Sequence, residues 1–181
     1  MGLGALAIPS TAAARGAHTR EVRLQDRCDP ASFNAAIPSP PGQPPTCIPH
    51  SGERITFDKF LAKLNPVDFG HEKWNNHPDE LDLRSGDSIS ATVRGGEFHT
   101  FTEVPAFGPG CIPFINAALG LTGPAPTDAQ CTGPGGIFDT TGVLPNGLST
   151  FTVSDLPVGT HLFMCFIHPW MRTVVTVGND D

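Results

Sequence analysis

The sequence has no run of basic residues, and apart from its first residues it has no long hydrophobic stretch. Its 181 residues include 18 aspartates and glutamates but only 11 lysines and arginines, so the formal net charge is −7. A chain this acidic is repelled by nucleic acid and by anionic membrane surfaces, and a membrane-spanning helix needs about 20 mostly apolar residues in a row. We therefore expect no nucleic-acid partner and no insertion into a membrane.

Internal repeats are absent too, and the many turn-forming residues disfavour a helical bundle. The chain contains 20 glycines and 19 prolines, which favour short strands joined by loops. From residue 74 onward, short segments alternate apolar with polar residues, as strands buried on one face do. These segments are residues 80–94, predicted as two strands around a Ser-Gly turn, and residues 98–104, 149–156, 160–165 and 172–177. The pattern predicts an all-β fold, either an antiparallel sandwich or a barrel.

The sequence divides into three parts that differ in composition. Residues 1–14 are small and apolar and end in an alanine run, which predicts a truncated signal segment for export. Residues 15–73 are a proline-rich N-terminal extension, in which the apolar spacing of residues 55–65 predicts one short helix. Residues 74–178 are the predicted β domain, and residues 105–148 form a long loop rich in glycine and proline inside it.

Four of the five cysteines flank loops with little predicted regular structure. Cys28 and Cys47 lie on either side of a proline-rich loop, and Cys111 and Cys131 on either side of a loop rich in glycine and proline. Four cysteines allow three pairings, and we expect the two local pairs, because a covalent bond helps an irregular segment most. Disulfides persist in oxidising compartments, so together with the N-terminal segment they predict a periplasmic or secreted protein. Cys165 is then the unpaired thiol.

The unpaired thiol lies in the segment MCFIHPWMR, residues 164–172, which spaces Cys165, His168 and Met171 evenly between two predicted strands. A further ligand has to come from elsewhere, and a strand that follows a Gly-Gly pair offers His99. Glycine at such a place lets another backbone approach closely. Two His, one Cys and a weak axial Met suit copper in both of its oxidation states, whereas zinc prefers four strong ligands. These four side chains therefore predict a site for one copper ion.

The segments GGEFHTFTEV (95–104) and GTHLFMCFIHPWMRTVVTV (159–177) resemble the two halves of the copper site of the cupredoxins, above all of their amicyanin, pseudoazurin and plastocyanin branch. The resemblance implies a Greek-key β-sandwich over roughly residues 74–177, with one type 1 (blue) copper ion. It implies that the strong equatorial ligands are His99, Cys165 and His168. It implies that Met171 is the weak axial ligand. Thr100 stands where many members have an Asn that bridges the ligand loops, and we expect its side chain to donate a hydrogen bond there.

The resemblance also implies an electron carrier rather than an enzyme, working between larger redox proteins outside the cytoplasm. In this family the loop histidine reaches the surface through an apolar patch, so a redox donor and acceptor are expected to dock transiently near His168, Pro169 and Trp170. Phe107 and Pro113 are further candidates for the patch. We expect a monomer.

Two other functions remain open at this stage. A copper-binding or delivery protein would hold the metal without carrying electrons, although its usual exposed Met and His clusters fit poorly with a chain that has three Met. The other is an accessory domain of a copper oxidase or reductase system. The enzymes themselves need further copper centres built with His-x-His pairs, and the sequence has no such pair.

Overall fold

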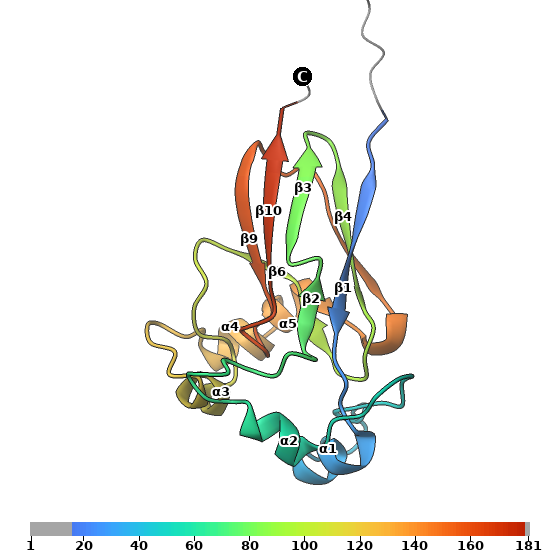
Figure 1. Cartoon of the computed structure of the whole chain (residues 1–181), viewed down its shortest axis with the longest axis vertical. Coiled ribbons are helices and arrows are strands. Elements are labelled where there is room, and N and C mark those ends of the chain that lie inside the picture. Colours follow the sequence, from blue (N-terminus) through green and yellow to red (C-terminus); the bar gives the residue numbers. More distant parts are fainter. Residues whose placement is uncertain (1–15, 180–181) are drawn as a thin grey trace, which may run out of the picture.

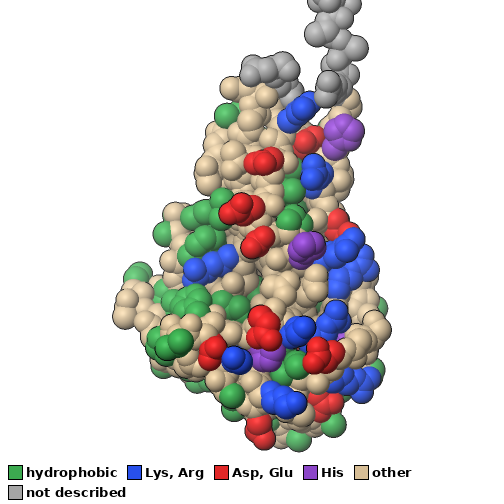
Figure 2. Space-filling model, viewed as in Figure 1, with side chains coloured by type: hydrophobic (Ala, Val, Ile, Leu, Met, Phe, Trp, Pro, Cys, Tyr) green, Lys and Arg blue, Asp and Glu red, His purple; other side chains and the backbone are tan. Residues whose placement is uncertain are grey.

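The computed structural model describes residues 16–179, in which strands form a sandwich and short helices gather at one end of it (Figure 1). The predicted export segment, residues 1–14, lies outside the described residues. None of the described helices has the length and apolar character needed to cross a bilayer. On the face shown in Figure 2, acidic and basic side chains are intermixed over the helical end.

One sheet has the strand order β2–β1–β4–β8. Its members are β1 (Thr19–Gln25), β2 (Asn75–His77), β4 (Ser88–Val93) and β8 (Thr150–Val153). β1 runs parallel to β4 and antiparallel to β2. Every second side chain of β4 is buried, as the alternating pattern predicted.

The other sheet has the order β3–β10–β9–β6. Its members are β3 (Glu80–Arg84), β6 (Thr102–Val104), β9 (Gly159–Met164) and β10 (Arg172–Gly178). A short separate pair joins β5 (His99–Thr100) to β7 (Gly142–Val143). Since the chain crosses between the two four-stranded sheets after β2, β3, β4, β6 and β8, the predicted all-β Greek-key sandwich is confirmed.

The N-terminal extension differs from the prediction, because its first strand belongs to the sandwich. We placed residues 15–73 outside the β domain, yet β1 lies between β2 and β4 in the middle of a sheet. Val22 and Leu24 of β1 are fully buried. These two apolar residues alternate with charged and polar residues over only a few positions. So short an alternation of apolar and polar residues does not predict a strand.

We call residues 26–74, which connect β1 to β2, the cap. It contains the helices α1 (Pro30–Ala36) and α2 (Phe57–Ala62), and α2 confirms the helix predicted within residues 55–65. Aromatic rings fill the space under the two helices, with ring centroids of the neighbouring pairs 4.8–6.1 Å apart among Phe33, Phe57, Phe60 and Trp74. The cap covers the same end of the sandwich as the other helices (Figure 1).

Residues 105–148 contain more regular structure than the predicted loop. The segment holds α3 (Pro113–Ala118), α4 (Asp128–Thr132), α5 (Ile137–Thr141), β7 and the 3₁₀ turn η1 (Pro145–Gly147). Both predicted disulfides are present, since Cys28 pairs with Cys47 in the cap and Cys111 with Cys131 in this segment. Each bond ties an irregular segment to itself at the helical end.

Candidate metal centre

Three side chains with metal-binding atoms converge at the helical end of the sandwich. His99 belongs to β5, Cys165 follows β9 directly, and His168 lies in the loop between β9 and β10. All three are buried, with exposed fractions of 0%, 0% and 2%. Their ligand atoms lie within 4.8 Å of one another, so the structure brings together three of the four predicted ligands.

The spacing of the donor atoms suits one ion in a plane between them. The Nδ1 atoms of His99 and His168 are 3.3 Å apart, and the Sγ atom of Cys165 is 3.7 Å from the first and 4.0 Å from the second. Metal bonds of about 2.0–2.1 Å to nitrogen and about 2.3 Å to sulfur, arranged at 120°, separate such donors by roughly 3.5–3.8 Å. The three atoms therefore need only small movements to hold a common ion.

Met171, the fourth predicted ligand, is fully buried in the same loop. Its backbone N–H donates to the carbonyl of His168 at 2.8 Å, and its carbonyl accepts from the N–H of Cys165 at 3.0 Å. These two bonds close the loop into a tight turn, and they tie the backbone of Met171 to those of two other candidate ligands. The role of its sulfur as an axial ligand stays a prediction.

Hydrogen bonds from Thr100 join the two ligand segments. Its backbone N–H donates to the sulfur of Cys165 at 3.4 Å, and its hydroxyl oxygen accepts from the N–H of Phe166 at 2.8 Å. We expected this side chain to donate a bond across the loops, and instead it accepts one, because the facing group on the Cys165 loop is a backbone N–H. The side chain of Thr100 thus bridges the two loops as a hydrogen-bond acceptor rather than as a donor.

The surroundings favour the thiolate form of Cys165. Burial by itself raises the pKa of this thiol, but the imidazoles of His168 and His99 more than offset the effect and hold its pKa well below the ordinary value. The thiolate is the form that binds metals. The site is therefore electrostatically prepared for a cation.

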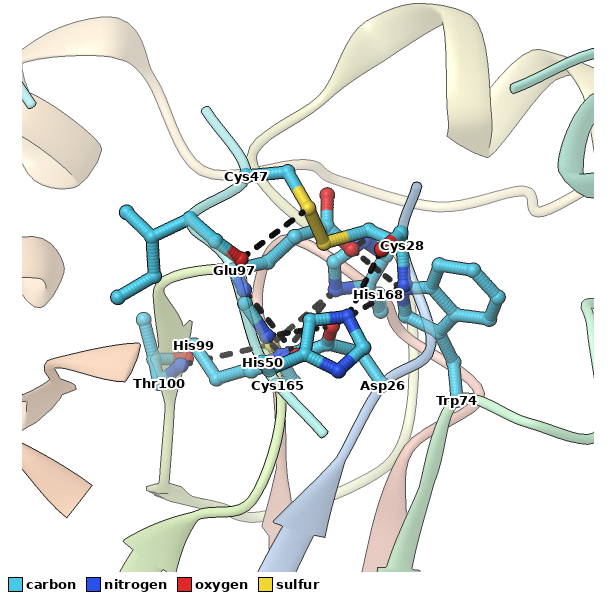
Figure 3. A network of polar contacts seen from close by, with 12 residues as sticks. Asp26, Cys28, Cys47, His50, Trp74, Glu97, His99, Thr100, Cys165 and His168 are labelled. Atoms are coloured by element: carbon cyan, nitrogen blue, oxygen red, sulfur yellow. Dashed lines mark hydrogen bonds and ion pairs between the residues drawn. A yellow bond between two sulfur atoms is a disulfide. The ribbon is translucent and has the colours of Figure 1, made fainter. Parts of the chain in front are cut away.

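A buried carboxylate faces the outer nitrogen of each imidazole (Figure 3). Asp26 Oδ2 lies 3.0 Å from Nε2 of His99, and Glu97 Oε2 lies 3.8 Å from Nε2 of His168. The indole N–H of Trp74 donates to the same oxygen of Glu97. With the Nε2 atoms turned outward, both Nδ1 atoms point at the sulfur of Cys165.

The carboxylates and the imidazoles shift one another's pKa values. Burial opposes ionisation of Asp26, yet the hydrogen bond and charge of His99, together with the backbone N–H groups of Gly96 and Glu97, outweigh it and lower the pKa of Asp26. Burial likewise disfavours charge on His99, but the carboxylate of Asp26 and the sulfur of Cys165 raise its pKa to about 10. Desolvation raises the pKa of Glu97 to about 7. The pKa shifts of Asp26 and His99 both favour the charged pair, and a metal that binds Nδ1 of His99 has to displace the proton there.

The cap covers His168, which corrects the expectation that this residue reaches the surface. The ring of His168 lies edge-on to Phe60 at 6.0 Å and to Trp170 at 5.3 Å between centroids, and Pro169 is buried as well. Trp170 is only half-buried, and its indole N–H donates to the carbonyl of Trp74 in the cap at 3.0 Å. The extension that the prediction separated from the β domain therefore closes the end that holds the candidate metal centre.

The other histidines in the structure stay apart from this cluster. His161 hydrogen-bonds to the carboxylate of Glu103 at 2.7 Å and to the carbonyl of Pro157, away from the cluster. His50 lies close to the sulfurs of Cys28 and Cys47, but those sulfurs are joined in a disulfide and are not thiolate ligands.

Sequence reasoning missed Asp26 and Glu97, although each left a signal in the strand pattern. Asp26 occupies the next inward position after Val22 and Leu24, so the alternation of β1 carries a carboxylate into the interior. Glu97 precedes His99 by two residues and shares its buried state. A carboxylate two residues away from a position predicted to be buried is itself expected to face the interior, and this rule identifies both residues.

Comparison with known proteins finds cupredoxins among solved structures. No family model and no curated protein matches the chain. A purple cupredoxin from Nitrosopumilus maritimus is 15% identical, with 64% of this chain and 95% of that one covered and a TM-score of 0.39. Oxidised plastocyanin from Dryopteris crassirhizoma is 16% identical, with 88% and 100% covered and a TM-score of 0.40. A reduced amicyanin variant is 20% identical, with 55% and 70% covered and a TM-score of 0.33. Since these TM-scores lie below 0.5, we base the proposed function on the site itself.

Proposed function

We propose that the protein binds one copper ion through His99, Cys165 and His168, with Met171 as a weak fourth ligand, and carries single electrons outside the cytoplasm. The observation that supports this most is the meeting of two imidazole nitrogens and one sulfur, 3.3–4.0 Å apart, in a buried site. A soft thiolate with two imidazoles is the donor set of blue-copper electron-transfer sites. Bound copper would supply reversible one-electron chemistry there.

The chain's own groups prepare the site for that task. The carboxylate of Asp26 fixes the orientation of the His99 ring, and the backbone N–H of Thr100 donates to the sulfur of Cys165. Buried and mutually bonded ligands change little in position when the charge of the ion changes. A site that keeps its geometry in both oxidation states is suited to fast electron transfer.

The direct test is an absorption spectrum during titration of the purified protein with Cu(II). We expect one equivalent to produce an intense visible thiolate-to-copper band, and Cys165→Ser to abolish it because the band requires the sulfur. His50→Gln, which alters a histidine outside the cluster, is the matched control and should keep the band. An intense band that survives in Cys165→Ser would contradict the assignment.

Measurements of electron exchange separate a carrier from a copper-binding or delivery protein. A carrier should cycle reversibly between Cu(II) and Cu(I) and exchange electrons rapidly with a second copy of itself. A protein that only stores or delivers copper should instead pass the ion to a chelator or acceptor and exchange electrons slowly. Slow exchange together with easy copper loss would favour the second function.

We propose that redox partners dock over Trp170, near Pro169 and His168, and that electrons pass through its ring. Trp170 is half-buried and lies edge-on to His168, which itself is almost fully covered. Trp170→Leu should slow reduction by a partner protein while leaving the visible band in place. An unchanged rate would move the entry point elsewhere.

Export is part of the same proposal. Two disulfides, Cys28–Cys47 and Cys111–Cys131, tie the helical end together, and such bonds persist in the periplasm or outside the cell. Fractionation of cells that make the full-length protein tests this directly. Recovery in the cytoplasm with reduced cysteines would contradict it.

A further inference from the structure

The outer nitrogens of both candidate imidazole ligands face carboxylates from which water is largely excluded. The Asp26 side chain is 0% exposed and that of Glu97 is 8% exposed. We infer that Asp26, with Glu97 in support, is a positioning residue that makes the bound copper favour Cu(II) over Cu(I). The inference rests on the proposed function.

Asp26 is held where its charge acts on His99. Its Oδ1 atom accepts the backbone N–H of Gly96 at 2.8 Å, and Oδ2 accepts the N–H of Glu97 at 3.2 Å besides the ring nitrogen of His99 at 3.0 Å. The backbone N–H of Cys28 also donates to Oδ1, at 3.4 Å. A carboxylate that accepts from four N–H groups is bonded as the ionised form. Its bond to Nε2–H leaves the lone pair on Nδ1 of His99 directed at the metal position, which makes this nitrogen a stronger donor.

Glu97 takes the corresponding place behind His168. Its Oε2 atom lies 3.8 Å from Nε2 of His168 and accepts the indole N–H of Trp74. The contact with the imidazole is longer than that of Asp26, so its influence should have the same sign and a smaller size. The two carboxylates come from different segments, one at the end of β1 and one just before β5.

The negative charge of Asp26, and that of Glu97 when it is ionised, interact more strongly with Cu(II) than with Cu(I), because the oxidised ion carries one more positive charge. In a buried site this difference is screened less than in water. Basic imidazoles act in the same direction, since they donate more strongly to the ion of higher charge. Removing a carboxylate should therefore weaken Cu(II) binding more than Cu(I) binding and raise the reduction potential.

The test measures Cu(II) affinity, Cu(I) affinity and reduction potential in the copper-loaded full chain, with competing chelators for the affinities. In Asp26→Asn we expect Cu(II) affinity to fall 10- to 100-fold, the range for lost carboxylate–histidine partners, and Cu(I) affinity to fall less. Each tenfold fall in Cu(II) affinity relative to Cu(I) affinity raises the reduction potential by about 59 mV. Asp26→Glu, which keeps the charge, should restore most of the ratio.

Glu97→Gln is the second variant, and it should raise the potential by a smaller amount even if Asp26→Asn does not fold. Glu103→Gln is the matched control, because it removes a carboxylate from His161, which lies outside the cluster, and it should leave the potential unchanged. Equal losses of Cu(II) and Cu(I) affinity in the Asp26 and Glu97 variants, with an unmoved potential, would overturn the inference. A wild-type protein that shows no thiolate-to-copper band would instead overturn the proposed function.

Discussion

At the scale of single residues, the two glycines that precede Glu97, Phe98 and His99 stand where the surrounding atoms leave no room for a side chain. A Cβ on Gly95 would collide with the carboxylate of Asp26, and one on Gly96 would collide with the carbonyl of Ile48. The pair therefore lets both the carboxylate behind His99 and the backbone of the cap come close. The predicted close approach of another backbone is confirmed at Gly96.

Gly96→Ala should destabilise the fold by about 1–3 kcal/mol, the usual cost of forcing an extra group into a packed interior. Its Cβ would lie 2.8 Å from the sulfur of Cys28 as well as against backbone. Gly108→Ala, where nothing lies within 4 Å of the added atom, is the control and should cost far less. Urea unfolding measures both, and equal losses would argue against the close contact of the cap.

Met171→Leu should keep copper and the visible band but change the reduction potential, because a weak axial ligand tunes the ion more than it holds it. Met164→Leu is the matched control, since Met164 is equally buried but lies in β9 rather than in the ligand loop. Voltammetry of both loaded variants is the measurement. A potential shift of the same size in both would exclude Met171 as a ligand.

Three of the four candidate ligands could be predicted from sequence because they lie close together in the chain. Cys165, His168 and Met171 lie within one short loop, and a thiol beside an imidazole is informative without a structure. Asp26 could not be predicted in the same way, because its role depends on β1 pairing with β4 and so on contacts between distant segments.

At the scale of elements, the pairing of β1 with β4 is the part of the fold that the sequence pattern does not predict. Only Val22 and Leu24 mark the buried face of β1, whereas the strands from residue 80 onward have longer alternating patterns that were recognised. Charged side chains reinforce the pairing, since Glu21 accepts from Arg94 at 2.7 Å and from Thr92 at 3.1 Å.

These bonds make the stability of the β1–β4 pair depend on pH. Hydrogen bonds from Arg94 and Arg23 lower the pKa of Glu21 from 4.5 to about 2. The stabilisation is therefore fully present above pH 4.5 and is lost as the pH falls through 2. Because the side chain is 34% exposed, the contribution should stay below about 1 kcal/mol.

Glu21→Gln should accordingly be less stable than the wild type at pH 7, and the difference should shrink as the pH is lowered from 4.5 towards 2. Urea unfolding at several pH values measures it. Glu80→Gln, at an exposed position of β3, is the control. A difference that stays constant down to pH 2 would show that the ion pairs of Glu21 do not contribute.

At the scale of the whole molecule, the cap and the sandwich act together to enclose the site. The cap begins with Asp26 behind His99 and ends with Trp74 beside Glu97, so both of its ends contact the candidate metal centre. The composition of residues 15–73 predicted irregular structure, but the covering of His168 depends on packing between aromatic side chains far apart in the sequence.

The Cys28–Cys47 bond should keep this cover closed. Replacing both cysteines by Ala should cost about 3 kcal/mol of stability, as expected for a loop of this size, and should speed removal of copper by a chelator. The matched control replaces Cys111 and Cys131, whose sequence separation of 20 is close to the 19 of the first pair. It should cost similar stability without the faster removal. Equal removal rates in the two variants would show that the cap does not guard the site.

The most direct test of the central claim is anomalous diffraction at the copper edge from crystals of the loaded protein. We predict one strong peak between the Nδ1 atoms of His99 and His168 and the sulfur of Cys165. A peak elsewhere, or none in crystals that contain copper, would contradict the proposed site.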